Sequence, residues 1–181
     1  MKKITFVTGN KRKLGEARSS CELFNIVVEQ KQILINEIQS HDPLAIAKRK
    51  ALDAYEITNA PLVVNDAFWS IPSLNGFPGG YMKDIAEWFK ADDFISLMRD
   101  TLDRRIIVTE CVVYKDSELL KVFTKEFIGM ISDSPKGNGN SIEQVAIFNG
   151  ITLAEHHDLG EFSEKPEDEV WYDFAKWFSE K

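Results

Sequence analysis

The chain has 181 residues, of which 44% are hydrophobic and 28% charged, a composition typical of globular proteins and a length that favours a single domain over residues 1–181. Its formal net charge of -7 argues against a nucleic-acid polymer as partner, because proteins that bind such polymers present basic faces, whereas a small anion needs only a local group of cations. The N-terminal apolar run is too short for the core of a signal peptide, and no segment has the apolar length of a membrane helix. We therefore expect a cytoplasmic protein without a membrane partner.

An apolar segment at 3–8 predicts a buried strand that leads directly into a helix over 11–24. At the junction, Gly9 suits a tight turn, and the short side chains of Thr8 and Asn10 can cap a helix or hydrogen-bond an oxyanion. Three cations follow in the first helical turn: Lys11, Arg12 and Lys13. Free amides and the helix dipole favour an anion at this position, so the junction predicts a phosphate site. An ordinary strand-to-helix turn with solvated lysines is the alternative.

The rest of the chain alternates between helix and strand patterns. Asp42 and Pro43 are typical of a helix start, as N-cap and first helical residue. We expect helices at 43–58, at 81–89, from Asp92 or Asp93 to about Leu102, and along the apolar stripe from Val170 to Phe178. We expect strands at 26–29, 33–35, 62–65 and 145–148, and a long hairpin formed by 106–114 and 119–130. Residues 67–80 and 132–140 are rich in Gly or Pro and predict loops. Together they predict an α/β fold: a mixed twisted sheet with a long antiparallel hairpin, helices packed on it, and a central cleft between two lobes.

Two acidic residues stand where a ligand would bind. Asp66 follows the strand at 62–65, and a carboxylate at the end of a buried strand in an α/β protein points into the ligand crevice. Glu37 follows the strand expected at 33–35 and could share an ion with Asp66, since Mg²⁺ is typically held by one or two carboxylates together with substrate phosphates. Lys48 and Lys83 could reach a phosphate as point charges. The alternatives are carboxylates that cap turns and lysines that are solvated.

Side chains that often bind transition metals do not form a convincing site. Cys21 and Cys111 stand in no spacing typical of zinc sites, and we expect buried free thiols. His156 and His157 are adjacent, so their side chains diverge on either a helix or a strand. We expect these histidines and the neighbouring Asp158 to be solvated surface residues.

Six segments stand in one order along the chain and are specific as a set: Phe6–Asn10 with Lys13 and Glu16, Glu37, Lys48, Val64–Asp66, Asn75–Lys83 and Thr152–Glu155. In this order and spacing they resemble the inosine triphosphate pyrophosphatase family, which acts on non-canonical purine nucleoside triphosphates. The resemblance covers nearly the whole chain, which is identified as a divergent member.

The resemblance implies hydrolysis of a nucleoside triphosphate to a monophosphate and pyrophosphate. It implies that Mg²⁺ bridges Glu37, Asp66 and the triphosphate, that Asp66 is the general base for the attacking water, and that the protein is a homodimer. The residues it implies for phosphate binding are Thr8, Asn10, Lys11, Lys13, Lys48 and Lys83. The residues it implies for the substrate pocket are Phe77, Tyr81, Phe148 and Lys165.

The chain also departs from the family pattern. Asn65 stands where the family usually has Glu, and Ile142–Ala146 stands where it has Phe-Gly-Trp-Asp-Pro. The family's Ser-His-Arg element is replaced by Glu169–Trp171. Two hypotheses follow: a Mg²⁺-dependent pyrophosphatase with altered base preference, or a non-catalytic descendant that binds a nucleotide or another small anion. A third, that the likeness is chance in an unrelated α/β protein, stays open at this point.

Overall fold

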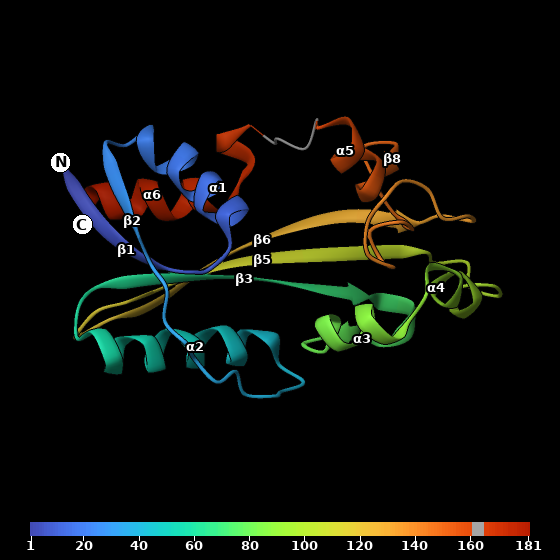
Figure 1. Cartoon of the computed structure of the whole chain (residues 1–181), viewed down its shortest axis with the longest axis horizontal. Coiled ribbons are helices and arrows are strands. Elements are labelled where there is room, and N and C mark those ends of the chain that lie inside the picture. The colour runs from blue at the N-terminus through green and yellow to red at the C-terminus, as the bar shows by residue number, and fades with distance from the viewer. Residues whose placement is uncertain (161–164) are drawn as a thin grey trace. The chain divides into compact units, whose positions relative to one another are not determined.

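The structure is a computed structural model that describes residues 1–160 and 165–181 (Figure 1). The chain divides into two compact units. The first comprises Met1–Ala67, Glu110–Lys125 and Glu164–Lys181, and the second comprises Phe68–Thr109 and Glu126–Ser163. The organisation as one domain stays a prediction, as does the cleft between lobes.

The first unit contains parallel strands and three α-helices. Its strands are β1 (Lys2–Val7), β2 (Ile26–Lys31) and the adjoining parts of β3 (Leu62–Ile71), β5 (Arg105–Lys115) and β6 (Leu120–Ile131), in the order β2-β1-β3-β5-β6. Its helices are α1 (Lys11–Glu22), α2 (Pro43–Thr58), the short 3-10 helix η2 (Pro166–Asp168) and α6 (Val170–Glu180). β1 pairs in parallel with β2 and β3, with Phe6 opposite Val63 as the last pair before β1 ends.

Apolar residues of α1 and α6 pack against apolar residues of the strands to form a core of this unit. Trp171 and Phe174 of α6 are fully buried, and the Trp171 ring lies 4.7 Å from that of Phe6 on β1 in an edge-to-face arrangement. The core includes Val63 of β3, whose neighbours in sequence point to the opposite face of the sheet because side chains alternate along a strand. Figure 1 shows α1 and α6 on one face of the strands and α2 on the other.

The second unit has its own strands, helices and core. Its elements are the remaining parts of β3, β5 and β6, together with η1 (Pro72–Leu74), β4 (Phe77–Gly79), α3 (Met82–Trp88), α4 (Ala91–Leu97), β7 (Ala146–Phe148), β8 (Ile151–Thr152) and α5 (Leu153–Leu159). β4 pairs antiparallel with β3, and β7 pairs antiparallel with β6 and β8. Phe94 and Met98 are fully buried in the core of this unit.

The structure confirms the mixed α/β fold and most of the predicted elements. The first strand, the helices that begin at Lys11 and Pro43, the long hairpin and the C-terminal helix all form close to their expected bounds. Asn10 and Asp42 cap the first two helices through their side chains. Cys21 and Cys111 are buried free thiols, as expected. Among the described residues, no helix is long and apolar enough to cross a membrane.

Three expectations about secondary structure were wrong. Residues 32–40 form no regular structure, so there is no strand at 33–35. The loop expected at 67–80 is partly strand, because Trp69 and Ile71 pair with β4 across an antiparallel ladder that extends β3 to Ile71. The helix α4 is capped at Lys90, two or three residues before the expected caps, and it ends at Leu97 and not at about Leu102. The Lys90 amide donates to the Asp93 carboxylate at 2.7 Å, and both aspartates lie inside the first turn.

The sequence patterns also missed one helix, α5. Thr152 and Glu155 form a capping box, with the Glu155 amide donating to Thr152 Oγ1 and the Thr152 amide donating to the Glu155 carboxylate. The threonine–glutamate spacing was visible in the sequence and is the signal that would have located this helix. On α5, His156 Nε2 lies 2.8 Å from the Phe148 carbonyl oxygen. The Asp158 carboxylate accepts a hydrogen bond from the Asn138 backbone amide at 2.9 Å. His157 and Asp158 are exposed, as expected, whereas His156 is half-buried.

Candidate active site

The turn between β1 and α1 is held by its own side chains. Asn10 Oδ1 accepts the amides of Arg12 and Lys13 at 2.9 and 3.3 Å, and Thr8 Oγ1 accepts the amide of Asn10 at 3.1 Å. We expected the Asn10 side chain either to cap a helix or to hydrogen-bond an oxyanion, and it caps α1. Two of the amides at the helix N-terminus are therefore already occupied.

Gly9 has a different role from the one that the sequence suggested. We expected Gly9 to serve a tight turn that crowds out a side chain, but no described atom beyond its two chain neighbours lies within 4 Å of the position that a Cβ at Gly9 would take. Gly9 instead lines a cavity, so the space above it is open to a ligand. A glycine at such a position lets the backbone approach a bound group closely.

Two carboxylates and two ammonium groups meet beside this turn. Lys50 Nζ lies 2.5 Å from Glu37 Oε1 and 3.8 Å from Asp66 Oδ2. Lys13 Nζ lies 3.9 Å from Asp66 Oδ1 and donates to the Asn65 carbonyl at 3.3 Å. The structure therefore brings together Glu37 and Asp66, which the sequence singled out as acidic partners, around the ammonium of Lys50.

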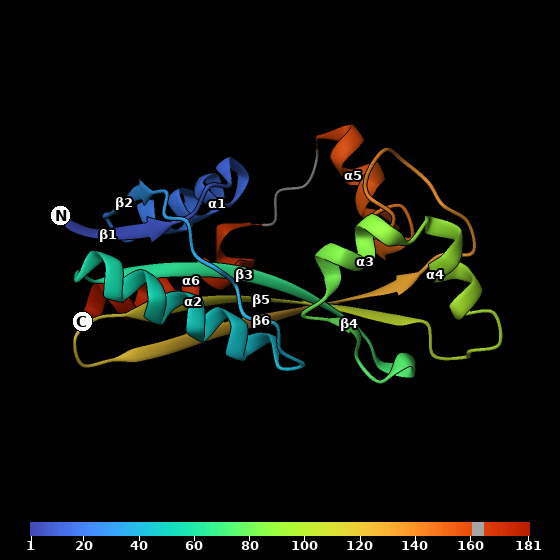
Figure 2. The ribbon, with the colours of Figure 1, turned by 60° about the horizontal axis from the view of Figure 1, so that its bottom comes forward.

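The position of Asp66 follows from strand geometry. β1 ends at Val7, whereas β3 continues past Asp66 to Ile71, so Asp66 lies within its strand and not at the strand end as expected. The carboxylate is accessible because the neighbouring β1 has already left the sheet. Asp66 shares a strand face with Leu62 and Val64, the face that α2 covers in Figures 1 and 2.

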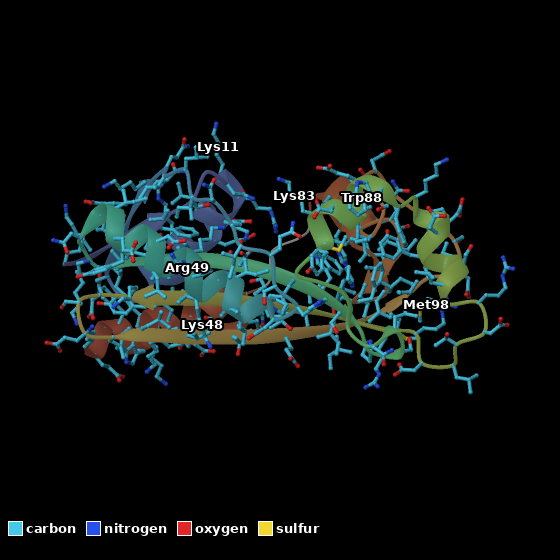
Figure 3. The ribbon with its side chains drawn as sticks, turned by 90° about the horizontal axis from the view of Figure 1, so that it is seen from below. Lys11, Lys48, Arg49, Lys83, Trp88 and Met98 are labelled. Atoms are coloured by element: carbon cyan, nitrogen blue, oxygen red, sulfur yellow. The ribbon has the colours of Figure 1, made fainter. Side chains whose placement is uncertain are left out.

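Sequence reasoning missed Lys50. Residues three or four apart lie on one face of a helix, and the buried Ala47, Ala51 and Ala54 mark the face of α2 that packs inward. Lys50 borders that face, which is why its side chain reaches Asp66. Lys48 points elsewhere: it is exposed and is not among the residues that line the cavity (Figure 3).

The charged groups line a cavity of about 310 Å³ in the first unit. The lining residues are Val7, Thr8, Gly9, Asn10, Lys13, Ile33, Leu34, Ile35, Glu37, Lys50 and Asn65. The cavity combines a helix N-terminus, two ammonium groups and a carboxylate, with Asp66 in contact with both ammonium groups. Such a set of groups suits a ligand that carries phosphates and a hard cation.

The surroundings of the site set its protonation states. Burial would lower the pKa of Lys50, but the charge of Asp66 and the hydrogen bond and charge of Glu37 outweigh it, so the pKa is raised and the amine stays protonated. Burial, with a smaller contribution from the charge of Asp66, raises the pKa of the Cys111 thiol to about 12. Asn65 is only 6% exposed, and its amide Nδ2 donates to the Cys111 carbonyl at 3.1 Å, which ties β3 to β5 next to Asp66.

The remaining predicted site residues lie outside this group. Lys11 on α1 and Lys83 on α3 are exposed and are labelled in Figure 3, and Lys165 is exposed at the start of η2. Three aromatic residues belong to the second unit and pack at the edge of its core: Phe77, Tyr81 and Phe148. Their participation in substrate binding stays a prediction.

Comparison with solved structures shows that other proteins share this fold. A HAM1 protein from Coxiella burnetii superposes with a TM-score of 0.82 at 18% identity, and the match covers 100% of both chains. The Ham1 family model matches residues 4–157, and the chain belongs to the Ham1 family. Inosine triphosphate pyrophosphatase 1 of Trypanosoma cruzi is 33% identical over 86% of this chain and 82% of its own length. The dITP/XTP pyrophosphatase of Methanosarcina acetivorans is 28% identical over 100% of both chains.

Proposed function

We propose that the protein hydrolyses a nucleoside triphosphate to the monophosphate and pyrophosphate, with Mg²⁺ as its cofactor. The observation that carries the proposal is the meeting of Glu37 and Asp66 at the Lys50 ammonium, beside the cavity that the turn after β1 lines. The names of the relatives, inosine triphosphate pyrophosphatase and dITP/XTP pyrophosphatase, support the same chemistry. The base that is preferred stays open.

The residues present fit a divalent cation. Carboxylate oxygens are the ligands that Mg²⁺ prefers, and Mg²⁺ is commonly held by one or two carboxylates plus substrate phosphates. Glu37 and Asp66 supply two such carboxylates, both within 4 Å of one ammonium nitrogen, so their oxygens already face a shared positive charge. Among the described residues no third acidic, His or Cys side chain joins them, which leaves the remaining ligands to phosphate oxygens and water. When bound, the ion would supply Lewis-acid stabilisation of the charge that develops on the phosphates.

The chain's own residues supply binding, orientation and proton transfer. Lys13 and Lys50 place two positive charges at the cavity and would neutralise phosphate oxygens as the leaving pyrophosphate develops charge. The turn from Thr8 to Asn10 would approach the phosphates through its backbone. Asp66 would accept a proton from the attacking water, because its carboxylate lies at the edge of the cavity, with 28% of its side chain exposed.

Pyrophosphate release from a panel of triphosphates with Mg²⁺ tests the proposal. We expect turnover by the wild type and a loss of at least about a hundredfold in Asp66→Asn, as removal of a general base commonly causes. Asp53→Asn is the matched control, since Asp53 pairs with Arg49 on α2 and does not line the cavity. Full activity in Asp66→Asn would exclude the catalytic role.

A second candidate is a non-catalytic protein that binds a nucleotide or another small anion. The contacts that favour it are those of Lys50 and Lys13, two ammonium groups that lie within 4 Å of the two carboxylates and balance their charge. A ligand that binds only the folded state raises its stability. Heat stabilisation by nucleoside triphosphates without any pyrophosphate release would therefore favour this candidate over the first.

The other expectations from the resemblance stay proposals. Lys11, Lys48 and Lys83 are proposed to contact phosphates from exposed positions, and the aromatic residues of the second unit and Lys165 are proposed to contact the nucleoside. A homodimer and a cytoplasmic location are proposed likewise; the mass of the protein in solution tests the former.

A further inference from the structure

One ammonium group joins the two carboxylates of the candidate active site. Lys50 Nζ donates to Glu37 Oε1 at 2.5 Å and lies 3.8 Å from Asp66 Oδ2. Within the described part of the chain, the Glu37 side chain has no other hydrogen bond or ion pair, and it belongs to the irregular segment 32–40. Lys50 therefore holds the Glu37 carboxylate beside Asp66.

The other ammonium group at the cavity, that of Lys13, has different surroundings. Its Nζ donates to the neutral Asn65 carbonyl at 3.3 Å and lies 3.9 Å from Asp66 Oδ1, beyond hydrogen-bond distance. Lys50 instead makes its short contact with a charged carboxylate, and its side chain is only 22% exposed. Of the two lysines, Lys50 is thus the direct counter-ion of the site carboxylates.

The position of this ammonium is also the one that a shared metal ion needs. An ion held by both Glu37 and Asp66 has to lie close to both carboxylates, which is where Lys50 Nζ lies. Two cations cannot share that position, because like charges a few ångströms apart repel strongly in a partly buried site. We propose that Lys50 is a positioning residue that takes the place of the metal ion: it keeps the carboxylates together without the ion and moves away from them when Mg²⁺ binds. The inference rests on the proposed function, which supplies the ion.

Such an exchange makes the site respond in opposite ways to two ligands. Lys50 competes with the metal ion for the carboxylates, so removing its charge strengthens the binding of the metal alone. Once released, the ammonium can reach a phosphate oxygen, so removing it weakens the binding of a metal–polyphosphate complex. A merely structural lysine would not give opposite signs, because damage to the site weakens the binding of both ligands.

Titration of the Lys50→Met variant with Mn²⁺ alone, followed by the electron paramagnetic resonance signal of the free ion, tests the inference. Mn²⁺ takes the same oxygen ligands as Mg²⁺. We expect the variant to bind Mn²⁺ about three- to tenfold more tightly than the wild type, the effect of removing a partly exposed competing ion pair. By calorimetry, it should bind the magnesium complex of inorganic tripolyphosphate at least about threefold more weakly. Lys176→Met is the matched control: it removes the same charge from an exposed position on α6 outside the cavity, and should change neither affinity.

Two further measurements separate the charge of Lys50 from its contribution to folding. Lys50→Arg keeps the charge and should bind Mn²⁺ no more tightly than the wild type. The wild type itself can be labelled with acetic anhydride and read by mass spectrometry. Acetylation of Lys50 should become faster when Mn²⁺ is added alone, because the amine leaves Glu37, whereas acetylation of Lys176 should not change.

The outcomes separate the inference from the proposed function. Binding of Mn²⁺ by Lys50→Met that is no tighter than that of the wild type overturns the inference, and so does acetylation of Lys50 that Mn²⁺ leaves unchanged. Weaker binding of both ligands by Lys50→Met overturns it in favour of a structural role. If Lys50→Met binds Mn²⁺ more tightly but the wild type releases no pyrophosphate from any triphosphate, the proposed hydrolysis fails while the exchange stands.

Discussion

Replacing Lys50 by Met tests whether one ammonium group holds the two site carboxylates. The substitution keeps the apolar stem but removes a charge that lies 2.5 Å from Glu37 and 3.8 Å from Asp66. A hydrogen bond between charged groups contributes about 1.5–3 kcal/mol, and exposed ion pairs contribute at most about 1 kcal/mol. Because the Lys50 side chain is 22% exposed but that of Glu37 is 51% exposed, solvent screens part of the interaction. We expect a loss of about 1–2 kcal/mol, measured by urea unfolding at pH 7.

The pH dependence of this loss follows from the raised pKa of Lys50. A group whose pKa is higher in the folded state contributes stability that is fully present below its unfolded pKa and is lost as the pH rises through the folded pKa. The difference in unfolding free energy between the wild type and Lys50→Met should therefore be constant around neutral pH. It should shrink in the alkaline range, where the amine of the wild type loses its proton.

The matched control is Lys48→Met, which removes an exposed lysine from the same helix. We expect a change within about 0.5 kcal/mol, as for most surface substitutions. A double-mutant cycle with Glu37→Gln should show a coupling energy with Lys50 and none with Lys48. Equal effects of the two lysine substitutions, or no coupling between Lys50 and Glu37, would refute the reasoning.

Three further predictions concern residues around the site. Gly9→Ala should fold with an unchanged melting temperature yet bind tripolyphosphate more weakly, because the added methyl enters open cavity space. The control is Gly15→Ala, which should leave binding unchanged. Gly15 also has no described atom within 4 Å of the Cβ position, but it does not line the cavity. Asn65→Asp places a carboxylate against the Cys111 carbonyl and should cost at least about 2 kcal/mol in urea unfolding; an unperturbed variant would show that the hydrogen bond carries no stability. Cys21 and Cys111, whose pKa values burial raises to about 12, should resist a disulfide reagent at pH 8 until the protein is unfolded; fast labelling of the native protein would contradict their burial.

Local patterns predicted much of the fold, and the sequence singled out two of the carboxylates that meet at the candidate site. The cap residue Asn10 and the pair Asp42–Pro43 located two helices, because capping depends on neighbours in the sequence. The pairing of Glu37 with Asp66 came from the family resemblance and from the chemistry of carboxylates, and the structure places both beside one ammonium. The segment around Glu37 was predicted as strand because its isoleucines have high β-propensity. Propensity does not reveal whether a partner strand is available, and β2 ends at Lys31.

The pairing of Lys50 with Asp66 was also within reach of the sequence. Lys50 borders the alanine face of α2, and Asp66 continues the strand face of Leu62 and Val64. A charge on an otherwise apolar face is costly to bury alone, so two such charges of opposite sign on elements that pack together are expected to meet. The sequence does not reveal that α2 covers this face of β3, because that arrangement depends on the whole topology. Apolar residues in place of such a buried pair are often equally stable or more so. The presence of these charges is therefore better explained by the ligand that we propose they bind than by the stability that they add.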